Sequence, residues 1–336
     1  MNVLFSEFCG LGNSVLLSSA FRTLKFYKKI KLFYVGNDKF SGLSIHKYNK
    51  FVDEIIDISK LNLKCLSRFN QIVIRSDIII IPEHSNPTLF FLVISALHKR
   101  KKIVTSHNFT NRLNFFKKII FTFLTFINQI KVLKINFPED IHEIEINMRF
   151  IENLIDNKNI PEDNIFNNYF DHPGDPSCLN KFNLKKNYFV LQPFCANGLN
   201  NYGKFSKSWP VKNFHKLTEF LLSNYRDHSI VFVGDKGDGK NILEHSNSDR
   251  IINLISQTSI SELISILKNS NFIICHDSSI LHLSDSMKLK NLSLFGPTKF
   301  TKNRPHNSKS FIIKKKTMEE ISIDEVTEII KKNIYT

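Results

Sequence analysis

Short apolar segments alternate with stretches of helical periodicity along the whole chain. In the first half, apolar runs of strand length occupy residues 2–8, 31–35, 52–58, 77–82, 102–105 and 130–135. Between them, apolar residues recur at helical spacing over residues 14–27, 87–98, 112–129 and 139–156. Strands that alternate with helices in this way predict a parallel sheet covered by helices on both faces.

The second half repeats this alternation. Its predicted strands span 188–194, 229–234, 251–254, 272–275 and 291–295, and its predicted helices span 211–224, 240–245, 259–268, 279–287 and 317–334. The sequence Asp171-His-Pro-Gly-Asp-Pro176 lies between the halves and is rich in residues that break helices and strands, so it predicts a linker. A chain of 336 residues is long enough for two domains that each bury a core. We therefore expect an α/β protein with a first domain over residues 1–175, a second over 176–316, and a terminal helix over 317–336 that packs back on the first.

Small polar side chains follow the predicted strand at 272–275. Asp277 stands where a helix N-cap is expected, and Ser278 and Ser279 follow it in the first turn. Such a helix start presents backbone N–H groups and favours an anion, for which a phosphate is the usual example. His282 lies four residues after Ser278, so the two side chains share one face of the helix.

A second polar turn follows the next predicted strand. Gly296, Pro297 and Thr298 come directly after the strand at 291–295, and the carboxyl ends of parallel strands meet at one edge of a sheet. Taken singly, an Asp-Ser-Ser start is a cap, a lone histidine is structural and a Gly-Pro pair is a turn. The combination at one sheet edge predicts a ligand site.

Charge and composition narrow the class of protein. Hydrophobic residues make up 42% of the chain, as in a globular protein, and the net charge is +15. Residues 1–150 hold 22 Lys and Arg against 11 Asp and Glu, whereas residues 151–336 hold 24 against 20. A basic first half indicates an anionic partner, such as a phosphorylated substrate, an anionic membrane or nucleic acid, or simply a basic surface. No nucleic-acid-binding module is recognisable, so we expect no nucleic acid partner.

The cysteines and the chain start bear on localisation. The five cysteines are scattered and form no Cys-x-x-Cys pair, which indicates reduced thiols and argues against a zinc site. The start lacks a basic segment before a long apolar core, and no run of about 18 apolar residues occurs. We therefore expect a cytoplasmic protein.

Residues 112–134 combine five phenylalanines with several lysines. Such a stretch suits the surface of an anionic membrane, but it also suits a core helix with a basic end. Because the apolar residues nearly encircle the helix axis, we favour the core helix.

The motifs of the second half resemble those of family 9 glycosyltransferases, the ADP-heptose:lipopolysaccharide heptosyltransferases and their relatives. Asp277-Ser-Ser-Ile-Leu-His282-Leu is similar to the family's D-[TS]-x-x-x-H-[LI], and Phe295-Gly-Pro-Thr298 to its F-G-P-T. Lys207-Ser-Trp209-Pro210 resembles its K-x-W-P, and Val231-Phe-Val-Gly234 its strand that ends in glycine. In the first half, the sequence from Gly10 to Leu24 resembles the family's G-x-G-D-x-[IL]-L-x-x-P-x-[IL]-[RK]-x-L, whereas the likeness is thin between about residues 36 and 180.

This resemblance implies a GT-B arrangement, in which two Rossmann-like doubly wound domains face a cleft. It implies an inverting glycosyltransferase without a cofactor or an obligatory metal. A nucleotide-diphosphate sugar, such as ADP-heptose, would bind the second domain, and a lipopolysaccharide, lipooligosaccharide or other cell-surface glycan would bind the first. If that acceptor is lipid-linked, the aromatic and basic stretch over residues 112–134 could bring the chain into peripheral contact with the anionic inner membrane. The implied donor ligands are Gly12, Ser14, Lys207, Gly234, Asp277, Ser278, Ser279, His282, Gly296, Pro297 and Thr298.

The residues themselves support this chemistry. A sugar that leaves a nucleotide diphosphate needs its developing negative charge stabilised, either by a metal held by acids or by helix ends and cations. The sequence contains no Asp-x-Asp triplet. The helix start at Ser278 and Ser279 together with Lys207 would provide the second solution.

One departure from the family pattern bears on catalysis. Where the family has an aspartate that is expected to deprotonate the acceptor hydroxyl, this chain has Asn13, and an amide cannot take a proton at neutral pH. Asn13 could orient the acceptor while Glu7, Glu83 or His84 acts as the base, or the reaction could need little help from a base. Alternatively, the chain is a nucleotide-sugar-binding relative with impaired catalysis and a regulatory role.

Overall fold

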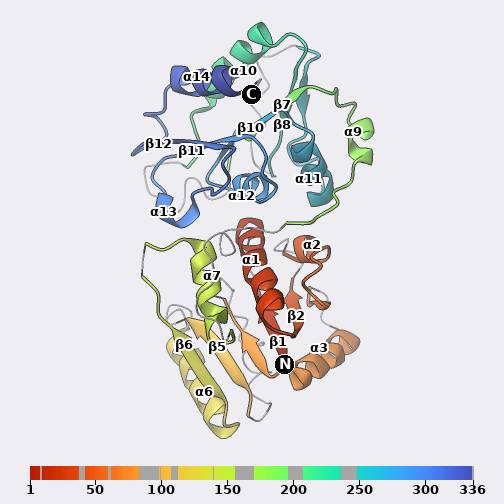
Figure 1. The fold of residues 1–336 in the computed structure, drawn as a ribbon, viewed down its shortest axis with the longest axis vertical. Coiled ribbons are helices and arrows are strands. Elements are labelled where there is room, and N and C mark those ends of the chain that lie inside the picture. The colour runs from red at the N-terminus through yellow and green to blue at the C-terminus, as the bar shows by residue number, and fades with distance from the viewer. Residues whose placement is uncertain are drawn as a thin grey trace. The chain divides into compact units, whose positions relative to one another are not determined.

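The computed structural model describes residues 1–7, 10–37, 42–59, 62–82, 98, 100–106, 113–138, 140–155, 170–195, 207–235 and 248–334. The chain divides into two compact units, Met1–Asp171 and His172–Thr336 (Figure 1). The division falls within the stretch of residues 171–176 that is rich in proline and glycine.

The first unit is built on a six-stranded parallel sheet. Its strands are β1 (Asn2–Ser6), β2 (Lys31–Gly36), β3 (Glu54–Asp57), β4 (Ile78–Ile80), β5 (Lys102–Ser106) and β6 (Lys131–Ile135). They are ordered β3-β2-β1-β4-β5-β6. Because the winding direction reverses between β1 and β4, the carboxyl ends of these two strands form the topological switch point of a doubly wound sheet.

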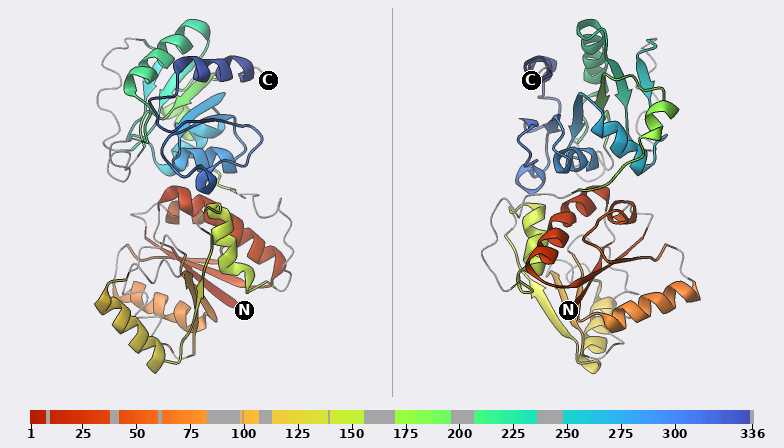
Figure 2. Two further views of the ribbon diagram at one scale, coloured as in Figure 1. Left: turned by 90° about the vertical axis from the view of Figure 1, so that its left-hand side faces the viewer. Right: turned by 45° about the vertical axis from the view of Figure 1, so that its right-hand side comes forward.

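Helices cover both faces of the first sheet (Figure 2). On one face, α1 (Leu11–Tyr27) contacts α7 (Glu143–Glu152) and the short α2 (Gly42–His46). The core on the other face includes residues of α3 (Leu63–Arg75) and α6 (Phe115–Ile127). Successive strand residues alternate between the two cores, as in β1, where Phe5 joins the α1 side and Leu4 the α3 side.

The second unit repeats this design. Its strands are β7 (Tyr188–Leu191), β8 (Ser229–Phe232), β9 (Ile251–Asn253), β10 (Phe272–His276), β11 (Asn291–Phe295) and β12 (Ser310–Lys314). They form a parallel sheet in the order β12-β11-β10-β7-β8-β9, so its switch point lies between β7 and β10. The sheet shares one core with α10 (Val211–Asn224) and α14 (Ile323–Asn333). In the described part of this unit, the other helices are α9 (Ser177–Lys181), α11 (Ile260–Lys268), α12 (Ser279–Ser286) and α13 (Phe300–Asn303).

The predicted fold class is confirmed, because both units are parallel α/β sheets, but several elements differ from the prediction. Helix α3 and strand β12 were not predicted, and α1 begins at Leu11 rather than at Ser14. The terminal helix begins at Ile323, because Ser322 and Glu325 form a capping box there. Its buried Val326 and Ile330 belong to the core of the second unit, and the packing of this helix on the first domain stays a prediction. The predicted helix at 240–245 and nearly all of the one at 87–98 lie outside the described residues.

Candidate functional site

The switch point of the second sheet brings several predicted residues together. Gln192 follows β7, and Asp277 and Ser278 follow β10, its neighbour in the sheet. The Ser278 hydroxyl donates a hydrogen bond to Gln192 Oε1 at 2.6 Å, which joins the two strand ends. Open α/β sheets bind their ligands at this position.

The start of α12 differs from the prediction. The helix begins at Ser279, and Ser278 rather than Asp277 is its N-cap. The Ser278 side chain makes no capping hydrogen bond, because its hydroxyl is turned toward Gln192. The first backbone N–H groups of α12 therefore have no cap from this side chain, and the positive end of the helix dipole suits an anion.

Lys207 lies beside the start of α12. Its Nζ is 3.7 Å from Oδ2 of Asp277 and 3.5 Å from the Asp277 carbonyl oxygen. The two side chains are 18% and 5% exposed, so the pair is largely shielded from water. Asn303 donates a hydrogen bond to the same Oδ2 at 3.2 Å. The Asp277 carboxylate thus holds an ammonium group at a helix N-terminus, and both favour a phosphate.

His276 holds the Lys207 segment against β10. Its ring is fully buried, and Nε2 accepts the backbone N–H of Trp209 at 2.9 Å. Burial, with a smaller contribution from the charge of Lys207, lowers the pKa of His276 to about 3. The ring is therefore neutral near pH 7 and able to accept this bond. Trp209 is itself a core residue and donates from Nε1 to the carbonyl of Ile321 at 2.9 Å.

The Gly296-Pro297-Thr298 turn follows β11 at the same edge of the sheet. Lys314 donates to the carbonyl oxygens of Gly296 at 2.7 Å and Thr298 at 3.3 Å. A Cβ on Gly296 would lie 2.7 Å from Met318 Sδ, so the turn packs closely only as glycine. Thr298 is 4% exposed, and its Oγ1 has no hydrogen-bond partner among the described residues. A buried hydroxyl without such a partner is suited to donate a hydrogen bond to an oxygen of a ligand.

His282 and Asp285 lie further along α12 and are buried. Asp285 accepts the backbone N–H groups of His306 at 3.1 Å and Asn307 at 2.8 Å, so it fixes the loop before β12. Burial raises the pKa of Asp285. The sequence analysis missed Asp285, Gln192 and Lys314. For Asp285 a signal existed, since it lies in the predicted helix that follows the buried strand 272–275, and an acid that is buried there needs hydrogen-bond partners.

Two other predicted donor residues lie at this sheet edge. Ser279 is the first residue of α12 and is half-buried. Gly234 follows β8, which pairs with β7 on the side away from β10, and its carbonyl accepts the Ser256 N–H at 2.9 Å.

The predicted residues of the first unit lie at the start of α1. Gly10 is the N-cap, which puts Gly12 and Asn13 in the first turn. Ser14 is fully buried, and its hydroxyl donates to the Gly10 carbonyl at 3.4 Å. This burial disfavours a direct contact between the Ser14 hydroxyl and a ligand.

Glu7 follows β1 at the switch point of the first sheet and is 3% exposed. Its Oε2 accepts the Tyr34 hydroxyl at 2.9 Å and lies 3.3 Å from His46 Nε2. Both partners are fully buried. Glu7 is thus a buried carboxylate with two side chains that fix its orientation. Glu83 and His84, the other predicted base candidates, lie outside the described residues.

Comparison with known families decides the identity of this arrangement. Residues 130–332 match the family model of glycosyltransferase family 9 (heptosyltransferase), which covers more than half of the chain. The chain belongs to glycosyltransferase family 9. The match includes every predicted donor residue of the second unit, from Lys207 to Thr298.

Individual members of family 9 are more distant. The chain is 32% identical over 117 residues to lipooligosaccharide heptosyltransferase 2 of Campylobacter jejuni NCTC 11168, over 32% of this chain and 35% of that protein. It is 24% identical over 115 residues to the Haemophilus influenzae protein of the same name, over 32% of this chain and 33% of that protein. The chain thus spans about a third of the length of the curated relatives that it matches.

Solved structures of family 9 proteins share the fold along nearly the whole chain. A family 9 glycosyl transferase from Veillonella parvula matches with a TM-score of 0.73 at 14% identity, covering 99% of this chain and 97% of that one. E. coli ADP-heptose LPS heptosyltransferase II matches with a TM-score of 0.70 at 15% identity, covering 100% and 99%. At these identities the likeness shows the fold.

Proposed function

We propose that this family 9 protein is an inverting glycosyltransferase that moves a sugar from a nucleoside diphosphate to a cell-surface glycan. The observation that carries the proposal is the juxtaposition of Lys207 and the start of α12 at the switch point of the second sheet. The name of its curated relatives, lipooligosaccharide heptosyltransferase 2, supports a heptose as the sugar and a lipooligosaccharide as the acceptor. The name of a structural neighbour, ADP-heptose LPS heptosyltransferase II, supports ADP as the carrier. An E. coli heptosyltransferase with ADP shares the fold, with a TM-score of 0.66 at 13% identity over 99% of this chain.

The donor diphosphate would bind against the start of α12. In the transfer step, the acceptor hydroxyl oxygen forms a bond to the anomeric carbon on the face opposite the leaving group. The bond from that carbon to the diphosphate oxygen breaks, and the diphosphate leaves with an added negative charge. The backbone N–H groups of α12 and the Lys207 ammonium would stabilise this charge. The Thr298 hydroxyl, the Gly296-Pro297 turn and Gly234 would line the rest of the donor site.

The acceptor would bind the first unit, where its hydroxyl proton must pass to a base. Asn13 cannot accept it, so we assign Asn13 to orienting the acceptor and Glu7 to taking the proton. Glu7 suits this task because it lies at the switch point of its own sheet and its orientation is fixed by Tyr34 and His46. The reaction would take place on the cytoplasmic side of the membrane.

Asn13 also favours a second candidate function, a relative that binds nucleotide sugars and no longer transfers them. The two candidates separate in a transfer assay with ADP-heptose and deacylated lipooligosaccharide. Formation of ADP and glycosylated acceptor supports the transferase, whereas donor binding without transfer or hydrolysis supports the binding protein. In the transferase, Asn13→Asp should change turnover while donor affinity stays the same.

The donor site is tested by thermal shift with a panel of nucleotide sugars and nucleoside diphosphates. We expect nucleotides to raise the melting temperature of the wild type, most strongly when they are ADP compounds. The variant Lys207→Ala should bind these nucleotides at least tenfold more weakly, which corresponds to about 1.4 kcal/mol of binding free energy. Lys216→Ala removes an exposed lysine of α10 in the same unit and is the matched control. If no nucleotide stabilises the wild type, the proposed function is wrong.

A further inference from the structure

Helix α6 exposes an apolar face rather than burying one. Only Phe121 and Thr125 of this helix are buried, at 7% and 8% exposure. Seven large apolar side chains are 40% to 82% exposed: Phe115, Phe116, Ile119, Ile120, Phe123, Phe126 and Ile127. At about 100° per residue they fall within an arc of roughly 140° centred opposite Phe121. The sequence-based interpretation of this segment as a core helix is therefore wrong.

This outward face, which we call the α6 surface, is unusual for a globular protein. The described residues include thirteen exposed large hydrophobic side chains, and seven of them lie on this one helix. A surface helix ordinarily turns polar residues away from the core. Scattered exposed hydrophobic residues need no explanation, but a contiguous patch of this kind marks an interaction surface.

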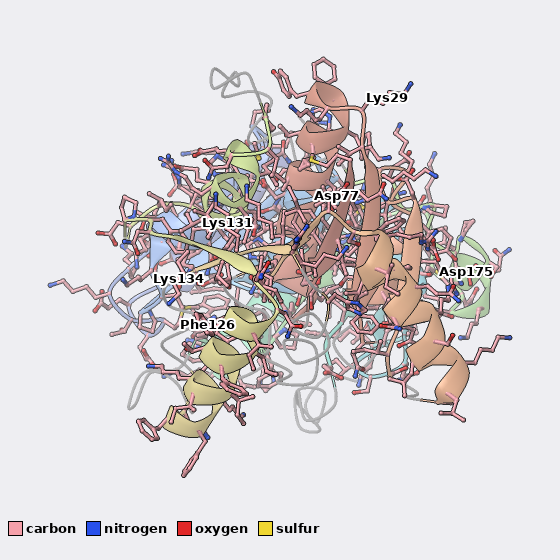
Figure 3. All side chains as sticks on the ribbon, turned by 90° about the horizontal axis from the view of Figure 1, so that it is seen from below. Lys29, Asp77, Phe126, Lys131, Lys134 and Asp175 are labelled. Carbon is pink, nitrogen blue, oxygen red and sulfur yellow. The ribbon has the colours of Figure 1, made fainter. Side chains whose placement is uncertain are left out.

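The sequence that contains α6 is basic. Residues 84–138 contain nine Lys and Arg and no Asp or Glu. Lys118 on α6 and Lys131 and Lys134 on β6 are exposed. Figure 3 shows Phe126 on α6 next to the strand that carries Lys131 and Lys134. The partner of this face must therefore accept aromatic side chains and carry negative charge.

We propose that α6 binds in the interface of an anionic lipid bilayer, with its axis parallel to the membrane. The phenylalanines and isoleucines would enter the boundary between headgroups and acyl chains, and the lysines would contact anionic headgroups. Helix α6 has 13 residues, whereas about 20 are needed to cross a bilayer, so contact at the surface is the mode that α6 allows. Among the described residues no helix is long and apolar enough to cross a membrane. A second copy of this chain fits less well, because pairing two α6 surfaces would bring like charges together.

This inference goes beyond glycosyl transfer and does not rest on the proposed donor site. It is tested by co-sedimentation of the full-length protein with vesicles, without donor or acceptor. The vesicles are pure phosphatidylcholine or phosphatidylcholine with about one third phosphatidylglycerol. Failure to bind would leave the proposed transferase untouched, and failure of the transferase would leave vesicle binding untouched.

Two pairs of substitutions probe the α6 surface. The double variant Phe123→Glu/Phe126→Glu places charges on side chains that are 60% and 82% exposed, so folding should be unaffected. Its control, Phe26→Glu/Leu63→Glu, makes the same change at the 74% and 86% exposed residues of α1 and α3. Lys131→Gln/Lys134→Gln removes two charges beside α6, and Lys29→Gln/Lys47→Gln removes two exposed charges elsewhere on the unit.

We expect the wild type to bind anionic vesicles and to bind pure phosphatidylcholine at least tenfold more weakly. The partition coefficient on anionic vesicles should fall at least tenfold in the phenylalanine double variant, and about fivefold for each charge removed in the lysine double variant. Both control variants should bind like the wild type. Equal binding of the phenylalanine pair and its control would overturn the proposal. So would a wild type that ignores anionic vesicles but dimerises in light scattering through Phe123 and Phe126.

Discussion

Acidification should destabilise the second unit through His276. The histidine pKa is about 6.5 in an unfolded chain, whereas burial lowers the pKa of His276 to about 3 in the folded protein. Between these values the unfolded chain binds a proton that the folded protein does not. The stabilising contribution of a neutral His276 is therefore complete above about pH 6.5 and is lost as the pH falls toward 3.

The size of this effect follows from the two pKa values. Each pH unit below about 6.5 removes about 1.4 kcal/mol from the free energy of unfolding, so the loss between about pH 7 and pH 5.5 is about 1.2 kcal/mol. His306, whose pKa burial lowers to about 4, adds in the same direction. Urea unfolding measures this loss, because Trp209 is the only tryptophan in the chain and its backbone N–H donates to His276.

The variant His276→Gln isolates the contribution of this ring. Glutamine keeps an oxygen that can accept the Trp209 N–H but has no titrating group. Its free energy of unfolding should fall by about 1.2 kcal/mol less than that of the wild type over the same pH interval. His306→Gln is the control that retains His276. If the wild type and His276→Gln lose the same stability on acidification, the buried neutral histidine is not what couples folding to pH.

Two further substitutions test other parts of the site. Gly296→Ala would place a Cβ 2.7 Å from Met318 Sδ, so the free energy of unfolding, measured with heat or urea, should fall by about 1–3 kcal/mol. An unchanged free energy of unfolding would mean that the turn is loosely packed. Glu7→Gln should lower kcat for transfer by about a hundredfold or more while the donor Kd stays the same; a loss of donor affinity with normal kcat would rule out Glu7 as the base.

The strand ends of the second unit could be predicted from the sequence because their signals are local. An apolar run followed by Asp277, Ser278 and Ser279 identifies both β10 and the start of α12. The assignment of the N-cap failed, because contacts distant in sequence decide it. Lys207, 70 residues away, lies beside the Asp277 carboxylate, and Gln192, 86 residues away, accepts the Ser278 hydroxyl.

The prediction that α6 is a core helix was wrong for a different reason. Hydrophobic periodicity reports that a helix has apolar positions around much of its circumference, but not which of them the sheet covers. In α6 the buried stripe around Phe121 is narrow, and the apolar arc that contains Phe123 and Phe126 lies outside it. Likewise, the close approach of Met318 to Gly296 joins two segments whose contact no local pattern encodes.

Binding of the donor diphosphate at the start of α12 can be measured by isothermal titration of ADP and ADP-heptose into the variant Ser279→Glu. A glutamate at the first helical position is compatible with the helix dipole, so the melting temperature should stay close to that of the wild type. The added negative charge should weaken binding at least tenfold, by about 1.4 kcal/mol. Ser177→Glu, the same change at the first residue of α9, should bind like the wild type. If Ser279→Glu binds both nucleotides as tightly as the wild type, the diphosphate does not bind at this helix.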